Sequence, residues 1–270
     1  MSPMRRWWLT GLVGVWIVAL GGLVVWSVDH DRATVPEQRD IDLALTDLER
    51  AAGVVYAAAG GDDRAVVLGE LQLTRDCRIT PVRSGLAAAR AVTVYVADTK
   101  TAEAVEQIAA GLPADWATDW GRSSAGTRVS LHADAGNFVG IDLSSPAVAT
   151  TFTLRLTTGC RPLDGEAPRE AGAAPAAPAP ALLNTVVGAL GGTVGEPTVR
   201  TVTCPSGSVA GSWTVTGVST PDDLPGHLRR AGGEVVHADE TVRAYRNRDD
   251  WVVVRPEGAQ LSVTVSTSCS

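Results

Sequence analysis

The sequence predicts an α+β fold, with an N-terminal transmembrane helix followed by two related domains. Each domain is expected to have the element order α-β-β-α-β-β-β, with its helices on one face of a mixed or antiparallel sheet. Three observations lead to this prediction. The chain begins with a long uncharged run, two later stretches repeat one order of patterns, and both stretches contain strand-like runs that end in cysteine. With 270 residues, the chain is long enough for two ordinary domains.

The uncharged run covers residues 7–28, WWLTGLVGVWIVALGGLVVWSV. As a helix it would span about 33 Å, which matches a hydrocarbon core about 30 Å thick. Arg5 and Arg6 precede the run and Asp29 and Asp31 follow it, so the N-terminus is expected in the cytoplasm. We therefore predict a cytoplasmic tail over 1–6, a single-span anchor over 7–28, a stalk over 29–40, and an extracytoplasmic location for the rest of the chain.

Two other interpretations of this run remain open. Ala19-Leu20-Gly21 is an acceptable cleavage site for a signal peptide, although Leu23–Trp26 continues the apolar run beyond it. Arg5-Arg6-Trp7-Trp8-Leu9 resembles a twin-arginine signal, in a stretch that is very hydrophobic for one.

The internal repeat is visible when the two cysteine-ended runs are superimposed. Residues 129–143 then align with residues 242–256, so that Phe138 meets Trp251 and Asn137 meets Asp250 in the turn. Three earlier pairs of segments correspond in the same order: 41–59 with 181–190, 68–77 with 197–204, and 91–112 with 212–233. We predict a first copy over 41–160 and a second copy over 182–270.

The elements of each copy follow from local patterns. Ile41, Leu45, Leu48, Ala52 and Val55 recur at helical spacing and predict a helix over 41–59, which the glycines at 60 and 61 end. In the second copy, the proline at 225 favours a helix that starts near it and is short. Strands with alternating polar residues are expected to face solvent on one side. The Ala/Pro-rich stretch 161–181 predicts a semi-rigid linker.

The four cysteines share the phase of the apolar residues in their strands. Four cysteines allow three pairings, and the repeat selects Cys77–Cys160 and Cys204–Cys269. These bridges would close loops of 83 and 65 residues. Each cysteine is expected at the C-terminal end of its strand, so the first and last strands, if neighbours in the sheet, must run parallel. Free thiols are the alternative, and the spacing does not fit a zinc site.

The composition and the motifs point to no reaction. The net charge of −7 argues against a nucleic-acid partner, because such binding depends on neutralising phosphates. The sequence contains no catalytic, nucleotide-binding or metal-binding motif, so we expect no cofactor and no metal. His132 falls at an ordinary strand position, and His237, Asp239 and Glu240 are expected to form a solvated turn.

One short stretch, LPADWATDW at 112–120, offers candidate binding residues. If it is helical, Trp116 and Trp120 form an aromatic face beside Asp115 and Asp119. Such a surface could stack on sugar rings, and two carboxylates could serve glycoside hydrolysis. The alternative, which we favour, is that both indoles pack against the sheet of the first copy.

The segments DCRITPVRSG (76–85) and HADAGNFVGI (132–141) resemble those of uncharacterised membrane-anchored actinobacterial proteins. The resemblance covers residues 29–160, contains no catalytic motif, and implies an anchored extracytoplasmic domain.

The sequence thus predicts a non-catalytic, membrane-anchored binding or scaffolding protein of the cell envelope, with an envelope protein or a glycan as partner. One alternative is a glycan-acting enzyme that uses Asp115 and Asp119. Another is an accessory subunit of a membrane complex, which would need an exposed apolar patch.

Overall fold

The computed structural model describes residues 12–23, 26, 40–81, 83–163, 177–231 and 233–269. The chain divides into two compact units, Met1–Gln38 and Arg39–Ser270. Residues 12–23 are helical. Among the described residues, no helix is both long and apolar enough to cross a membrane. The predicted tail, the predicted stalk apart from Asp40, and residues 7–11, 24, 25, 27 and 28 of the predicted anchor lie outside the described residues.

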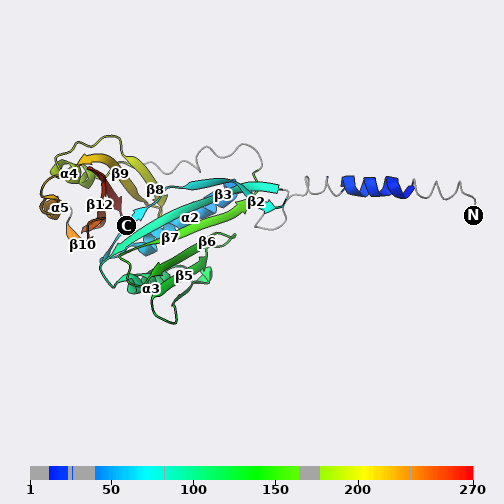
Figure 1. The fold of residues 1–270 in the computed structure, drawn as a ribbon, viewed down its shortest axis with the longest axis horizontal. Helices are drawn as coiled ribbons and strands as arrows, with labels where there is room; N and C mark the ends of the chain where they lie inside the picture. Colours follow the sequence, from blue (N-terminus) through cyan, green and yellow to red (C-terminus); the bar gives the residue numbers. More distant parts are fainter. Residues whose placement is uncertain are drawn as a thin grey trace, which may run out of the picture. The chain divides into compact units, whose positions relative to one another are not determined.

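Within the described residues 40–163, a seven-stranded antiparallel sheet forms the first sheet, with strand order β1-β3-β7-β6-β5-β4 and with β2 also paired to β3. Figure 1 shows α2 lying along β3 and β7. The elements are α2 (Ile41–Ala59), β1 (Arg64–Leu68), β2 (Gln72–Thr80), β3 (Arg83–Val96), α3 (Thr101–Gly111), the 3-10 helix η2 (Ala114–Trp116), β4 (Asp119–Arg122), β5 (Arg128–Asp134), β6 (Gly140–Pro146) and β7 (Thr151–Arg161).

Within the described residues 177–269, six antiparallel strands form the second sheet, in the order β10-β11-β12-β13-β9-β8. The elements are α4 (Ala181–Ala189), β8 (Thr198–Thr203), β9 (Val209–Ser219), α5 (Leu224–Ala231), β10 (Glu234–Ala238), β11 (Arg243–Asn247), β12 (Asp250–Glu257) and β13 (Gln260–Thr267). The predicted α+β class is confirmed, and both sheets are antiparallel.

The predicted repeat is visible in the order of the strands. The series β2-β3-β7-β6-β5-β4 in the first sheet corresponds to β8-β9-β13-β12-β11-β10 in the second. The predicted element order omitted β1, β4 and β10. Strand β1 is an addition to the first copy, and it pairs with one end of β3 while β2 pairs with the other. Residues 164–176 of the predicted linker lie outside the described residues, and the division into domains at 161–181 stays a prediction.

Helix α2 packs against both sheets. It contacts β3 and β7 of the first sheet and β8 of the second. Asp40 caps its N-terminus by accepting a hydrogen bond from the Asp42 backbone N–H. On the side toward β8, a Cβ atom at Gly53 would overlap the Thr203 carbonyl oxygen, so glycine permits this close approach. The apolar face predicted from the sequence is therefore only part of what the helix buries.

The second sheet has the helices of its own copy on one face, as predicted, but its other face is also buried, which corrects the expectation that this face meets solvent. One face packs against α4 and α5, and the other shares a hydrophobic core with α2 and β1 of the first copy. Ser262, Thr264 and Ser266 were expected to face solvent, but they are 8%, 4% and 0% exposed. Small hydroxyl side chains can be buried here because they hydrogen-bond: Ser212 Oγ lies 2.7 Å from Ser266 Oγ and accepts from the Leu68 backbone N–H at 2.8 Å.

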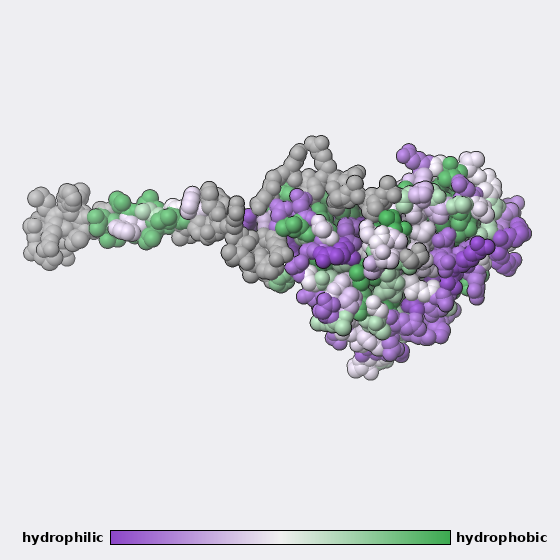
Figure 2. All heavy atoms as spheres, turned by 180° about the vertical axis from the view of Figure 1, so that it is seen from behind, coloured by the Kyte–Doolittle hydropathy of each residue, from purple (hydrophilic) through white to green (hydrophobic). Residues whose placement is uncertain are grey.

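The first sheet keeps the predicted alternation on its outer face. Burial in β5 and β6 alternates residue by residue between buried and exposed. Figure 2 shows one face of the molecule, where hydrophilic and hydrophobic residues are interspersed over the second unit. Large exposed apolar side chains among the described residues 40–269 come from several separate elements: Leu43, Phe138, Val148, Val199, Val209 and Val235.

Both predicted disulfides are present. Cys77 pairs with Cys160 at a Cα–Cα distance of 5.7 Å, and Cys204 pairs with Cys269 at 5.6 Å. In the sequence analysis we considered first and last strands that are neighbours in the sheet, but the strands joined by each disulfide are not neighbours. In each copy the two strands flank a third, β3 or β9, and both are antiparallel to it, so they run in one direction as predicted.

The first bridge needs a close approach across β3. Cys77 lies within β2 rather than at its end, because β2 continues to Thr80. Its partner position on β3 is Gly85, where a Cβ atom would overlap the Arg161 carbonyl oxygen of β7. Register shifts near both cysteines bend the strands further. Glycine and two bulges thus bring the outer strands within bridging distance.

Candidate functional site

The predicted aromatic pair does not lie on one helix. Trp116 is the last residue of η2, and Ala117 then adopts a left-handed conformation (φ 46°) that turns the chain into β4. Trp120 is therefore a strand residue opposite Leu131. Trp116 is 9% exposed and belongs to the core, and Trp120 is half-buried against that core.

The two carboxylates of this stretch remain at the surface. Asp115 and Asp119 are both exposed. Asp119 lies opposite His132 on β5, which lies opposite Asp142 on β6. His132 Nδ1 and Asp142 Oδ1 are 2.8 Å apart, but their side chains are 64% and 62% exposed, so solvent screens the pair. These residues form a solvated polar surface on the outer face of the first sheet.

The predicted solvated turn starts only after His237, because His237 belongs to β10 and its side chain is 10% exposed, whereas Asp239 and Glu240 follow the strand. Asp239 Oδ1 accepts hydrogen bonds from the backbone N–H groups of Thr241 and Val242. His237 Nε2 lies 3.0 Å from Asp239 Oδ2, and its Nδ1 lies 3.8 Å from Asp98 Oδ1 of the first copy. The hydrogen bond from His237 and those from residues 241 and 242 hold the pKa of Asp239 below its ordinary value. His237 therefore contributes a polar contact between the copies.

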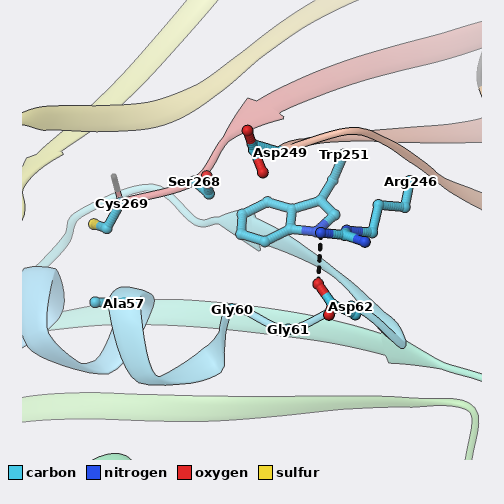
Figure 3. A pocket seen from close by; sticks show the side chains of 9 residues that line it. All are labelled: Ala57, Gly60, Gly61, Asp62, Arg246, Asp249, Trp251, Ser268 and Cys269. Atoms are coloured by element: carbon cyan, nitrogen blue, oxygen red, sulfur yellow. Dashed lines mark ion pairs between the residues drawn. The ribbon is translucent and has the colours of Figure 1, made fainter.

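A cleft where the two copies meet is the best candidate for a binding site. We name it the junction cleft (Figure 3), and its volume is about 270 Å³. It is lined by Ala57, Gly60, Gly61 and Asp62 of the first copy and by Arg246, Asp249, Trp251, Ser268 and Cys269 of the second.

Two chain turns place these residues. Helix α2 ends at Ala59, and Gly60 continues in an extended conformation with its N–H donating to the Ala57 carbonyl. On the second copy, the tight turn between β11 and β12 includes Arg248 in a left-handed conformation (φ 57°). Trp251 follows on β12 and meets Tyr56 of α2 edge-to-face, with ring centroids 6.0 Å apart. The cleft lies between the end of α2 and this turn.

Some polar groups at the cleft have hydrogen-bond or ion-pair partners and others do not. Arg246 forms an ion pair with Asp62 at 2.6 Å, which Figure 3 marks. The Tyr56 hydroxyl donates to the Thr267 carbonyl at 2.9 Å, and burial raises the pKa of Tyr56. Burial, and secondarily Asp249, raises the pKa of Asp250 beside the cleft. Trp251 Nε1 has no hydrogen-bond partner among the described residues.

This arrangement suits binding better than bond-breaking chemistry. The lining offers a guanidinium group, two carboxylates, a hydroxyl and the ring of Trp251, whose N–H is buried, without a histidine or a free thiol. Among the described residues, no three His, Cys, Asp or Glu side chains are grouped as metal ligands would be. The structure has turns at residues 62–63 and 248–249, and Asp250, which the sequence alignment placed in a turn, is the first residue of β12. Sequence patterns could not bring these two distant turns together.

Comparisons with known proteins assign no function. No protein-family model matches the chain, and no curated protein matches it. The crystal structure of a DUF4853 family protein from Actinomyces odontolyticus aligns with a TM-score of 0.40 and 13% sequence identity, over 88% of this chain and 98% of that chain. A similarity of this size gives no residue a role, and the resemblance to membrane-anchored actinobacterial proteins stays a prediction.

Proposed function

We propose that the chain is a membrane-anchored binding or scaffolding protein of the cell envelope, and that it is not an enzyme. In this proposal residues 1–6 are cytoplasmic, residues 7–28 span the membrane once, and residues 29–270 lie outside. The partner is an envelope protein or a glycan.

The observation that carries the extracytoplasmic location is the pair of disulfides. All four cysteines of the chain are bridged. Structural disulfides form and persist in oxidising compartments and are rare in the cytosol. The uncharged run 7–28, preceded by two arginines, adds an independent argument for a membrane anchor and for its direction.

A binding role is supported by how firmly the two copies are joined. Arg90 is 5% exposed and its guanidinium donates to the Thr201 carbonyl of the second copy at 3.1 Å, while it also pairs with Glu49. Tyr56 and Ser212 add further buried hydrogen bonds between the copies. A body with such buried cross-links presents surfaces in a fixed relation, which a scaffold requires.

The glycan-acting enzyme has less support. Its two carboxylates, Asp115 and Asp119, are exposed on η2 and β4, and Trp116 is part of the core. A glycosidase needs its carboxylates on either side of a bound sugar. The accessory-subunit hypothesis lacks a specific observation in its favour.

Topology is the first test of the proposal. Protease added to intact spheroplasts that carry the full-length chain should degrade residues 29–270, with a cytoplasmic protein protected in the same sample. In parallel, thiol alkylation of the unreduced protein should label no cysteine. A protected body, or alkylation of the unreduced chain, would contradict the proposal.

A further inference from the structure

The junction cleft contains a buried hydrogen-bond donor that lacks an acceptor. Trp251 is 2% exposed, and its Nε1 has no partner among the described residues. Figure 3 shows its ring among the residues that line the cleft. A buried N–H without an acceptor costs free energy, so an acceptor from outside the protein would be favoured at this point. Trp213 Nε1 is also unpartnered, but Trp213 does not line the cleft, so other observations are needed.

The charges around the cleft favour a cation. The C-terminal end of α2 carries the partial negative charge of the helix dipole, and its last turn contains no basic residue. Asp62 and Asp249 add two carboxylates. Arg246 is the one cation among the lining residues, and it is paired with Asp62. The buried guanidinium of Arg64 lies beside Gly61, so the helix end already has a cation next to it. Asp249 forms no ion pair among the described residues, and its carboxylate is the group that would attract a cation.

The size of the cleft limits its occupant. Its volume of about 270 Å³ equals roughly nine water molecules at about 30 Å³ each. We infer that the junction cleft binds a small cationic molecule that also carries a hydrogen-bond acceptor, as amino sugars and amino alcohols do. This inference rests on the binding role proposed above and gives it a ligand class.

The ion pair at the rim controls access to the indole. The Arg246 and Asp62 side chains are 26% and 89% exposed, whereas Trp251 Nε1 is closed to solvent. When the pair opens, the ligand's ammonium group replaces the guanidinium group at Asp62 and approaches Asp249. Its hydroxyl oxygen then accepts the hydrogen bond of Trp251 Nε1. The occupant thereby connects residues of both copies.

Calorimetry on the full-length chain in detergent tests the inference. The probes are glucosamine and its neutral counterpart glucose, and the smaller pair ethanolamine and ethylene glycol. We expect at least one amine to bind at least tenfold more tightly than its neutral counterpart. Asp249→Asn should weaken that binding about tenfold, and Arg246→Gln should strengthen it because a competing cation is removed. Asp115→Asn, an exposed carboxylate outside the cleft, should change nothing.

Several results would overturn the inference. They are binding of neither amine, equal binding of an amine and its neutral counterpart, and no response to Asp249→Asn. Trp251→Phe removes the N–H group and should weaken binding about fivefold or more; if this variant does not fold, Asp249→Asn and Arg246→Gln decide the question. The topology experiment is separate, so failure of the cleft and failure of the extracytoplasmic location are distinguishable.

Discussion

Asp250, the first residue of β12, lies where its negative charge is disfavoured. Burial raises the pKa of this carboxyl, and the neighbouring Asp249 raises it further. Because the folded pKa lies above the unfolded value, the contribution of Asp250 to stability is full below the unfolded pKa, near 4, and is lost as the pH rises through the folded pKa. We therefore expect Asp250→Asn to raise the Tm at pH 7 and to leave it nearly unchanged at pH 3.

Thermal unfolding of both proteins at the two pH values measures this difference. Asp115→Asn serves as the control, because an exposed carboxylate should not change the Tm at either pH. A lower Tm for Asp250→Asn at pH 7 would show that its carboxylate makes a favourable contact that outweighs burial.

Residues that the sequence aligned between the two copies have different surroundings. Phe138 lies in the turn before β6 and is 46% exposed, whereas Trp251 lies in β12 and is 2% exposed. Trp251 is buried because it meets Tyr56 on α2 of the other copy. A local pattern reports on the strand and its own sheet, so it located both hairpins, but it matched these residues wrongly and could not predict the burial. The junction cleft was missed for the same reason.

At the scale of the element, two effects act in opposite directions on the stability of the protein when Gly53 of α2 is replaced by alanine. Alanine is favoured over glycine by about 1 kcal/mol within a helix. At Gly53, however, an added Cβ atom would overlap the Thr203 carbonyl oxygen of the second sheet. Backbone atoms cannot easily move aside, so we expect Gly53→Ala to destabilise the protein, by about 1–3 kcal/mol as for other overpacked core positions.

Urea unfolding followed by circular dichroism would measure this change. Gly188→Ala in α4 is a matched control, since an added Cβ atom there meets nothing within 4 Å and the helical preference alone should act. Equal stabilisation by both substitutions would mean that α2 and β8 are not packed as described.

Some elements followed from the sequence and others did not. The helix predicted over 41–59 is α2, because its apolar spacing and the glycines after it are local signals. The stretch 112–120 was predicted wrongly as a possible helix, since the left-handed turn at Ala117 has no strong sequence signature. The alternating serines and threonines of β13 suggested solvent, but α2 and β1 cover that face. Polar alternation cannot distinguish water from a hydrogen-bonding neighbour.

At the scale of the whole molecule, the two copies should unfold together. The core around α2 includes residues of both sheets, and the bridge Cys204–Cys269 joins strands that flank β9. Replacing both of these cysteines by alanine should lower the Tm by about 5–15 °C, for a loss of about 2–4 kcal/mol. The transition should remain single, because the first copy loses the cover of its helix when the second copy unfolds.

Differential scanning calorimetry under non-reducing conditions checks this expectation. The same replacement at Cys77 and Cys160 should also lower a single transition. Two resolved transitions, one of them at the original temperature, would show that the copies are independent. The repeat in the sequence was sufficient to predict both bridges. The shared core could not be predicted in this way, because the spacing of apolar residues in α2 does not show that the helix packs against two different sheets.

The sharing of α2 has a consequence during synthesis. The Tyr56 hydroxyl finds its acceptors on residues that are 155 and 211 positions later in the chain. At about 5–20 residues per second, the later acceptor is made roughly 10–40 s after the tyrosine. For that interval the face of α2 that packs against the second sheet has no cover. In the extracytoplasmic location proposed above, export therefore requires that the unfinished first copy be kept from aggregating until the last strand is made.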